Sequence, residues 1–329
     1  MNSNGVGKAW IQFLNQHPNY EHSAGMAYFL TEFIYLFAKY FCDLKVNGVE
    51  NIPYGNRFAW THNHSGWMAV DAPLIGHLLG GHKKVEKIRW SGDRMGFMAH
   101  FKKILGCEPG DWGVSFWHDV GIQLPFIGWA MRVFHGLPVS HLKDPKKLNG
   151  YRIYATPAEG EEGSFKSSIF ELYHLKRFRT GVARLALENN LDYLLPVSIV
   201  GPEETFPNLG NISFFKKILG FDIPLPLPVL PIPVNWVVSF LRPVPLREYR
   251  RQFKKSRSLD GKKAICQEIM DRVRADIAAE IKKSRNGRRP FSIHFQSWPW
   301  SHRSDPVLEE RHFTEFKPLG RPSRRAAEA

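Results

Sequence analysis

Apolar runs separated by polar, glycine-rich connections recur along the chain and predict alternating strands and helices. Residues 193–200 form a continuous apolar run, of the kind found in a strand that is buried on both faces. Shorter apolar segments at 58–60, 137–139, 151–155 and 234–240 predict further strands, and 44–53 alternates apolar with polar positions as a strand does. We expect the strand at 44–53 to lead into the one at 58–60.

Segments whose apolar residues have helical spacing lie between several of these strands. Residues 181–188 predict a helix that leads directly into the strand at 193–200, and 72–75 begin another helix after the strand at 58–60. Residues 260–283 predict a basic amphipathic helix whose core-facing stripe is Ile265, Ile269, Val273, Ile277 and Ile281. The order strand, helix, strand predicts an α/β fold with a parallel or mixed sheet covered by helices.

The aromatic segment 26–41 is a third kind of pattern. It is interrupted by Glu32 and Lys39, which a spanning helix of about 20 apolar residues rarely tolerates. Bulky aromatic residues with occasional charges are typical of an interfacial helix that lies on a bilayer, and equally of a helix packed against the domain. Both interpretations predict a helix here.

Three regions follow from these patterns. We expect residues 1–43 to form an N-terminal amphipathic, membrane-associating helix and 44–283 to form one main domain. Residues 284–329 are a basic, aromatic tail with little periodicity that we expect to be poorly ordered. Within the domain, prolines alternate with aliphatic residues over 223–233, which excludes a helix or a central strand because proline lacks the N–H. We interpret this run as an apolar excursion toward the bilayer, with a proline-rich ligand for a protein partner as the less favoured alternative because the intervening residues are aliphatic.

Charge and cysteine content narrow the classes of function. The chain has 45 Lys and Arg against 31 Asp and Glu, a net charge of +14, which suits lipid headgroups, nucleic acid or the phosphates of an acyl carrier. Its 3 cysteines are far apart and predict neither a disulfide framework nor a zinc site. The start of the sequence lacks the pattern of a secretory signal, so we expect an intracellular protein.

Candidate chemistry lies just after the strand at 58–60. His64 can take and return a proton near neutral pH, and Asp71 is a carboxylate that could orient the imidazole and stabilise its charged form. The small residues Ser65 and Gly66 leave room for a substrate hydroxyl and a thioester carbonyl beside the ring. His64 and Asp71 are therefore the predicted general base and its orienting residue, although a single His-Asp pair is more often structural.

Four segments, taken in order, resemble the glycerolipid acyltransferase family, which includes 1-acyl-sn-glycerol-3-phosphate acyltransferases. These segments are Val46-Asn47-Gly48-Val49-Glu50-Asn51-Ile52-Pro53, then Asn63-His64-Ser65-Gly66 with Asp71, then Pro157-Ala158-Glu159-Gly160, and finally Leu195-Pro196-Val197-Ser198-Ile199-Val200-Gly201. The resemblance implies that His64 deprotonates an acceptor hydroxyl, that Asp71 orients it, and that Glu159 and Gly160 help to hold the acceptor. It spans roughly residues 44 to 250.

The chain departs from the family pattern in the first motif. Six residues separate His64 from Asp71, where the usual pattern has four, so a bulge in the loop must bring the carboxylate back to the ring. His62 lies two residues earlier on the same strand face and has no carboxylate at either spacing. We therefore expect a structural role for His62.

The basic residues that hold an acceptor phosphate in the family also differ. The second motif normally supplies an arginine, whereas 136–143 contains none, and His141 or Lys143 is the candidate substitute. Glu161 and Glu162 follow Gly160 where a threonine and an arginine are common, and Lys166 is a neighbouring basic residue that could restore positive charge. A lysophospholipid with a diester headgroup, or a neutral lipid alcohol, is thus as plausible an acceptor as lysophosphatidic acid.

The sequence as a whole predicts an acyltransferase at the cytoplasmic face of a membrane. Its co-substrate is acyl-CoA or acyl carrier protein, and we expect no metal and no other cofactor. Two alternatives stay open: a nucleic-acid binder, for which no recognition motif is present, and a non-catalytic lipid-binding relative. Salt-sensitive oligonucleotide binding would favour the first, and liposome binding without turnover the second.

Overall fold

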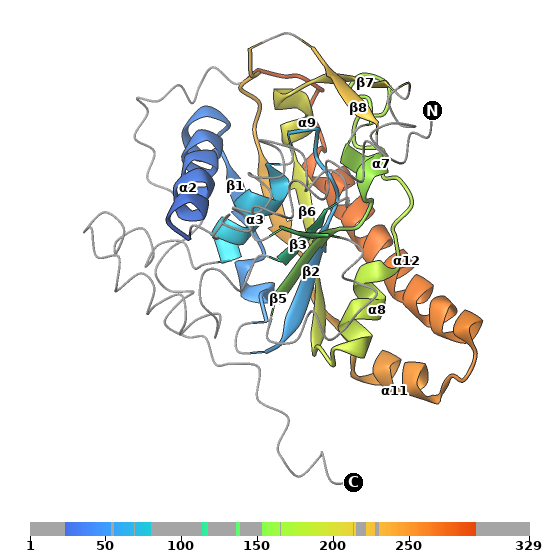
Figure 1. The fold of residues 1–329 in the computed structure, drawn as a ribbon. Coiled ribbons are helices and arrows are strands. Elements are labelled where there is room, and N and C mark those ends of the chain that lie inside the picture. The colour runs from blue at the N-terminus through green and yellow to red at the C-terminus, as the bar shows by residue number, and fades with distance from the viewer. Residues whose placement is uncertain are drawn as a thin grey trace, which may run out of the picture.

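A mixed sheet forms the centre of the protein in the computed structural model (Figure 1). The structure describes residues 24–53, 56–68, 70–79, 114–117, 136–138, 153–164, 166–212, 214, 222–227 and 230–293. Within these residues the sheet has eight strands in the order β1-β9-β6-β2-β5-β3-β4, with β10 also paired to β6. Its strands are β1 (Lys45–Asn47), β2 (Phe58–His62), β3 (Val114–Trp117), β4 (Gly136–Pro138), β5 (Ile153–Pro157), β6 (Tyr193–Val200), β9 (Val237–Phe240) and β10 (Val244–Pro245).

Strand β2 lies at the centre of this sheet. It pairs in parallel with β5 on one side and with β6 on the other. All five of its residues are buried, which explains why its first three residues are apolar. Because the carboxyl ends of β2, β5 and β6 lie at the same edge, the residues that follow these strands are brought together.

Helices cover both faces of the sheet. Figure 1 shows α2 and α3 on one side and α8, α11 and α12 on the other. The helices and helical turns are α2 (Ala24–Phe41), η1 (Val49–Asn51), α3 (Asp71–Leu79), α7 (Glu161–Ser164), α8 (Gly181–Glu188), α9 (Pro202–Thr205), α11 (Arg247–Lys255) and α12 (Leu259–Ser284). The predicted α/β class, with a parallel or mixed sheet covered by helices, is confirmed, and the sheet is mixed and mainly parallel.

Alternation along the central strands divides the apolar core into two layers. Phe58 and Trp60 of β2 face the cluster that contains α2 and α3. Ala59 faces the opposite cluster, which is built from α8, α11 and α12. Since side chains of a strand point to opposite faces in turn, each sheet face receives its own set of helices.

Proline 196 interrupts the central strand β6 without breaking it. Strand β6 pairs with β9 from Val197 onward and with β10 before it, at Leu194 and Tyr193. Pro196, which has no N–H to donate, therefore lies where β6 changes its antiparallel neighbour. This position accommodates a proline in a strand that is otherwise buried and hydrogen-bonded.

Most strongly periodic segments form the predicted elements. Helix α8 and strand β6 have the predicted bounds, and Ile269, Val273 and Ile277 are fully buried along α12. The strand at 44–53 is only partly confirmed, since β1 ends at Asn47 and the chain turns into η1. Moreover β1 pairs in parallel with β9, so it lies at the sheet edge and is not a neighbour of β2.

Helix α2 packs against the domain with one face. Tyr35 and Ala38 are buried in the same cluster as α3, whereas Phe33 and Tyr40 are more than half exposed. The interpretation as a helix packed on the domain is confirmed for the buried face. Among the described helices, none is both long enough and apolar enough to span a membrane.

A separate two-stranded sheet follows α9 in the chain. It consists of β7 (Asn208–Ile212) and β8 (Ile223–Pro226), which pair in an antiparallel arrangement with a register shift between Asn208 and Asn211. The proline-rich run at 223–233 thus begins as a strand outside the central sheet, as its prolines require. The division of the chain at residues 43 and 283 stays a prediction, and residues 294–329 lie outside the described part.

Candidate active site

The loop that follows β2 is attached to the neighbouring strand by an asparagine. The Asn63 side-chain amide donates to the Ile199 carbonyl at 2.9 Å, and its oxygen accepts from the Ile199 N–H at 2.9 Å. These two bonds continue the pairing of β2 with β6 after the backbone of β2 has left the sheet. The next residue, His64, is held at a defined position as a result.

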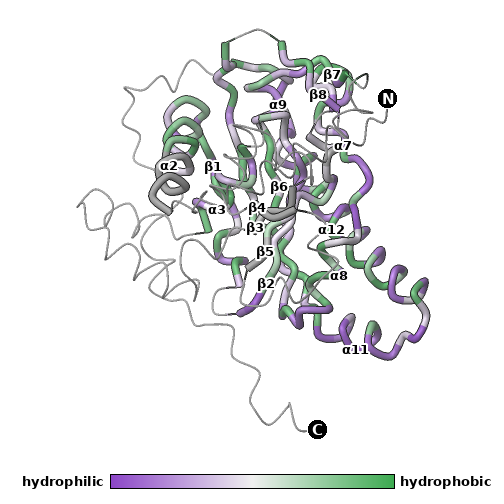
Figure 2. Tube along the Cα trace, in the orientation of Figure 1, coloured by the Kyte–Doolittle hydropathy of each residue, from purple (hydrophilic) through white to green (hydrophobic). Residues whose placement is uncertain are grey.

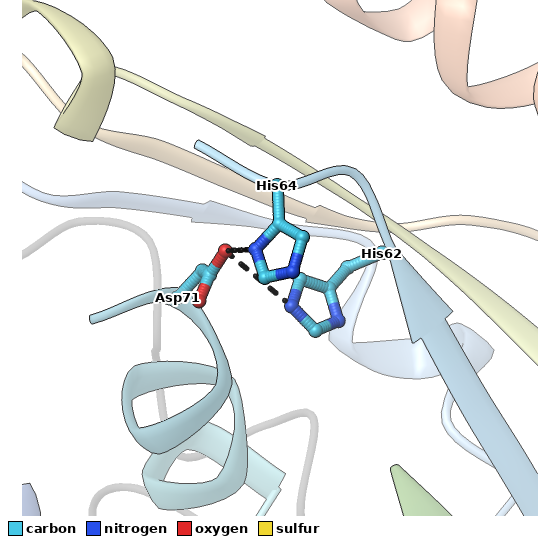
Figure 3. Close-up of side chains that lie close together, drawn as sticks. All are labelled: His62, His64 and Asp71. Carbon is cyan, nitrogen blue, oxygen red and sulfur yellow. Dashed lines mark hydrogen bonds and ion pairs between the residues drawn. The ribbon is translucent and has the colours of Figure 1, made fainter. Parts of the chain in front are cut away.

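His64 and Asp71 form a direct hydrogen bond. The His64 Nδ1 lies 2.9 Å from the Asp71 Oδ2, and Figure 3 shows the ring beyond the end of β2 with the carboxylate at the start of α3. His64 is 4% exposed and Asp71 is fully buried. Among the described residues none hydrogen-bonds to His64 Nε2, the ring nitrogen opposite the carboxylate. This is the geometry of a base with its orienting carboxylate.

The loop folds back so that Asp71 reaches the ring despite the longer spacing. The Ser65 N–H donates to the same Asp71 oxygen at 3.2 Å, and the Ala72 N–H donates to the other oxygen at 2.9 Å. Burial by itself raises the pKa of the Asp71 carboxyl, but the imidazoles of His64 and His62 outweigh burial and hold that pKa well below its usual range. Asp71 is thus a carboxylate at neutral pH.

His62 contacts the same oxygen of the Asp71 carboxylate as His64 does. Its Nε2 lies 3.5 Å from Asp71 Oδ2, and its ring is 5.8 Å from that of His64, centroid to centroid (Figure 3). The inference from spacing that His62 lacks a carboxylate partner is therefore wrong, because the loop brings back a residue nine positions later. Burial lowers the pKa of His62 more than Asp71 raises it, so this imidazole is neutral.

Glu159 lies behind the His64 loop. Its two carboxylate oxygens accept the backbone N–H of His64 at 3.0 Å and that of Lys176 at 2.8 Å. The side chain is fully buried. At Gly163, in α7, an added Cβ would lie 2.4 Å from the Glu159 Cβ and 3.1 Å from the His64 Cβ, so only glycine allows α7 to approach this closely. The contacts of Glu159 favour a positioning role, and acceptor binding by Glu159 and Gly160 stays a prediction.

Ser65 and Gly66 line the turn next to His64. The Ser65 hydroxyl is buried and has no hydrogen-bond partner among the described residues. Gly66 has φ near 100°, a backbone conformation that favours glycine, and an added Cβ would lie 3.4 Å from the backbone of Glu203. A buried hydroxyl beside a base that has no partner in the described part of the chain is well placed to contact a reacting group.

Lys166 does not present its charge to solvent. Its ammonium lies 2.9 Å from Glu203 Oε1 and 4.0 Å from Glu159 Oε2, and it donates to the His174 carbonyl at 3.2 Å. Burial lowers the pKa of Lys166, but the Glu203 and Glu159 carboxylates outweigh it and raise that pKa. Phosphate binding by Lys166 stays a prediction. Its described contacts connect Glu203 of α9 with Glu159, the carboxylate that accepts from the His64 N–H.

The adjacent Glu204 is directed to other partners. Its carboxylate accepts from the Tyr173 hydroxyl, from Arg288 Nη2 at 2.8 Å and from the Phe291 N–H. Arg288 also donates to the Asn235 carbonyl at 2.8 Å. The segment that follows α12 is thereby attached to α9, and the sequence contains no local signal for this contact across 84 positions.

The structure therefore brings together some of the predicted site residues. His64, Ser65 and Gly66 lie in the loop after β2, Asp71 begins α3, and Glu159 supports this loop from the turn that follows β5. His141 and Lys143 fall outside the described residues. Sequence reasoning did not assign the amide bonds of Asn63, although an asparagine directly after a buried strand is a usable signal. The catalytic and binding roles themselves stay predictions.

The cluster could also hold a metal ion. The ligand atoms of His62, His64 and Asp71 lie within 4.8 Å of one another, and two histidines with one carboxylate are a donor set known for transition metals. A metal there would compete with the hydrogen bond between His64 and Asp71 for the same lone pairs. Metal binding and proton transfer by His64 are therefore alternative uses of this cluster.

Comparison with known proteins gives distant relatives. No family model matches the chain. An uncharacterized protein of Mycobacterium leprae is 24% identical over 268 residues, which are 78% of this chain and 64% of the relative. An uncharacterized protein of Mycobacterium tuberculosis is 24% identical over 263 residues, 77% of this chain and 64% of the relative. The chain thus spans about 64% of the length of these curated relatives.

One similar solved structure is that of PlsC, the 1-acyl-sn-glycerophosphate acyltransferase of Thermotoga maritima. The sequences are 16% identical, and the match covers 86% of this chain and 96% of that chain with a TM-score of 0.44. A likeness at this level carries no conclusion about site or substrate.

Proposed function

We propose that the protein is an O-acyltransferase that moves a fatty acyl group from acyl-CoA or acyl carrier protein to the hydroxyl of a lysophospholipid or a related glycerolipid. The observation that carries the proposal is the 2.9 Å bond between His64 Nδ1 and Asp71 Oδ2, at the carboxyl end of the central strand. The order of the motifs around His64, Glu159 and Leu195–Gly201 supports acyl transfer to a glycerolipid over other uses of a His-Asp pair.

His64 acts as the general base in this mechanism. Its Nε2 takes the proton of the acceptor hydroxyl as the oxygen attacks the thioester carbonyl carbon, while Asp71 stabilises the imidazolium through Nδ1. A C–O bond forms and the C–S bond breaks. The leaving thiolate receives the proton from His64, so an ester and a free thiol are produced without a covalent enzyme intermediate.

The groups around His64 supply positioning and polar contact. We assign the Ser65 hydroxyl, which is buried and has no partner within the described ranges, to the reacting carbonyl or its developing oxyanion. Glu159 holds the backbone of His64, and the buried ion pair of Lys166 with Glu203 holds Glu159 and the α9 turn in place. Such fixed geometry favours acyl transfer because the two substrates must meet in one orientation.

The nature of the acceptor follows from the basic residues near the site. Lys166 is committed to Glu203, and Arg179 reaches Glu162 at the surface, with 3.5 Å between the charged atoms. His141 and Lys143 are the remaining predicted phosphate contacts. Because these two residues could contact a headgroup phosphate, we favour a lysophospholipid acceptor. A neutral lipid alcohol is the alternative. The enzyme acts at the cytoplasmic face of a membrane, without nucleic acid and without a cofactor besides the acyl donor.

The test is acyl transfer by the purified protein and two histidine variants. Detergent-solubilised wild type, His64→Ala and His174→Ala are incubated with acyl-CoA or acyl carrier protein and a panel of lysophospholipids and lipid alcohols. His174 is the matched control because its side chain is exposed. Free thiol and new esters are followed by mass spectrometry. We expect acceptor-dependent ester with wild type and His174→Ala, and a rate about 10²–10⁴-fold lower with His64→Ala.

Two outcomes would contradict the proposal. Product formed at the wild-type rate by His64→Ala would exclude His64 as the base. No product with any acceptor and either donor, in a preparation that still binds liposomes, would favour the non-catalytic lipid-binding relative. Dialysis against a chelator distinguishes proton transfer by His64 from metal binding by the cluster. Proton transfer by His64 predicts full activity after dialysis, whereas a required metal predicts a loss of activity.

A further inference from the structure

Apolar side chains are exposed around β7 and β8. We call this set the hairpin patch; its members are Ile169, Phe170, Leu209, Ile212, Leu225 and Leu230. Phe170 is 83% exposed and Leu230 is 87% exposed. In Figures 1 and 2 this end of the molecule lies opposite the strongly hydrophilic helix α11. Apolar residues this exposed and this close in the structure mark an interaction surface.

Backbone hydrogen bonds hold the two flanking loops to the hairpin. The Ser168 N–H donates to the Asn208 carbonyl at 2.8 Å, which places the loop with Phe170 beside the start of β7. On the other flank, the Leu227 N–H donates to Pro207 at 3.0 Å and the Ile232 N–H to Thr205 at 3.0 Å. Leu230 lies between these two anchors, so the patch is one connected region.

The chemistry of this region favours a lipid surface over a protein strand. The sequence from Thr205 to Phe221 contains no Asp or Glu and two lysines, which suits an anionic surface. Pro224 and Pro226 lack the N–H groups that a strand added to β8 would need, which disfavours pairing with a second copy of the chain. A bilayer requires only apolar burial and positive charge.

The patch is also joined to the candidate active site. Strand β7 follows α9 directly, and Glu203 of α9 lies against Gly66, next to His64. On the other flank, Lys166 pairs with Glu203 and is followed three residues later by Ile169. A surface at this end therefore lies on the side of the site where α9 and Lys166 pack against the turn after β2.

We infer that the hairpin patch docks on a phospholipid bilayer that carries anionic headgroups and so brings the site to its lipid acceptor. The inference rests on the proposed function for the lipid nature of that acceptor. Docking itself needs no turnover. It can therefore be measured whether or not the acyltransferase proposal holds.

The experiment is cosedimentation of the purified full chain with vesicles. The vesicles consist of phosphatidylcholine alone or mixed with phosphatidylglycerol, and the patch variant carries Phe170→Ser and Leu230→Ser. Leu259→Ser is the matched control, because Leu259 is 63% exposed at the start of α12, next to α11. Phe33→Ser tests α2 as the competing contact. Circular dichroism confirms that each variant has the wild-type secondary structure.

We expect wild type, Leu259→Ser and Phe33→Ser to bind the phosphatidylglycerol vesicles alike. The patch variant should bind them roughly tenfold or more weakly, from the apolar area that two large side chains bury. Unchanged binding by the patch variant would overturn the inference, as would no binding by the wild type to either vesicle. Self-association of the wild type, abolished in the patch variant and without vesicle binding, would assign the patch to a second copy and also overturn it.

Discussion

The turn after β2 and the turn after β6 handle buried charge in different ways. Both follow neighbouring parallel strands, and each contains a buried carboxylate, Asp71 in the first and Glu203 in the second. Asp71 faces two imidazoles, whereas Glu203 faces the ammonium of Lys166. An imidazole exchanges a proton near neutral pH, but Lys166 has a raised pKa and stays charged.

This difference separates chemistry from support. The first turn keeps a nitrogen that can accept a proton, and its carboxylate is positioned to stabilise the charge that results. The second turn pairs the Glu203 carboxylate with the Lys166 ammonium, although burial raises the pKa of Glu203, and the neighbouring Glu204 is attached to Arg288. We therefore expect changes in the first turn to act mainly on rate, and changes in the second to act mainly on the free energy of unfolding.

The largest expected effect is on catalysis at the first turn. Asp71→Asn should lower kcat about 10²–10⁴-fold, because the amide cannot stabilise the imidazolium of His64. The rate of ester formation is measured against Asp260→Asn, whose carboxylate is 96% exposed. A rate near that of the wild type would remove Asp71 from the mechanism and with it the contrast between the two turns.

Breaking the ion pair of the second turn should have an effect almost as large, but on the free energy of unfolding and not on the rate. Lys166→Met should lower the free energy of unfolding by about 3–5 kcal/mol, because the buried Glu203 carboxylate loses its charged partner. Urea denaturation measures the loss. The double variant with Glu203→Gln should recover part of it, since no unpaired charge is then buried. A loss under about 1 kcal/mol would show that the pair does not hold the turn.

The attachment of the segment after α12 should contribute less to the free energy of unfolding than the ion pair of Lys166 with Glu203 does. Arg288→Gln should lower the free energy of unfolding by about 1–3 kcal/mol, because Glu204 keeps its other donors but loses the guanidinium. The matched control is Arg289→Gln, which removes the same charge from an exposed side chain. Equal stability of the two variants in urea denaturation would contradict a specific role for Arg288.

The smallest expected effect is a pH dependence that originates at His62. Burial lowers its pKa, so the unfolded chain binds a proton on this group before the folded protein does. Its contribution to stability is present above the ordinary histidine pKa of about 6.5 and is lost as the pH falls below it, by up to about 1.4 kcal/mol per pH unit. His62→Gln should lack this slope in urea denaturation at a series of pH values. If the free energy of unfolding of His62→Gln depends on pH as steeply as that of His174→Gln, His62 is not the source of the pH dependence.

Local pattern determined a large part of this structure. The continuous apolar run at 193–200 and the helical spacing at 181–188 and 260–283 act over a few turns or one strand, and they form β6, α8 and α12. The position of His64 after a short apolar strand was predictable for the same reason. Asp71 lies close in sequence, so a local bulge sufficed to bring it to the ring.

Tertiary structure alone decided the remaining contacts. The bond of the His64 N–H to Glu159 joins residues 95 positions apart, and that of Arg288 to Glu204 joins residues 84 apart. The placement of β1 beside β9, and the approach of His62 to Asp71, likewise depend on which strands become neighbours and how the loop folds back. Periodicity reports which face of an element is buried, but not what is buried against it. The sequence by itself therefore determined the elements and the candidate base, and the packing of the sheet decided which charges surround that base.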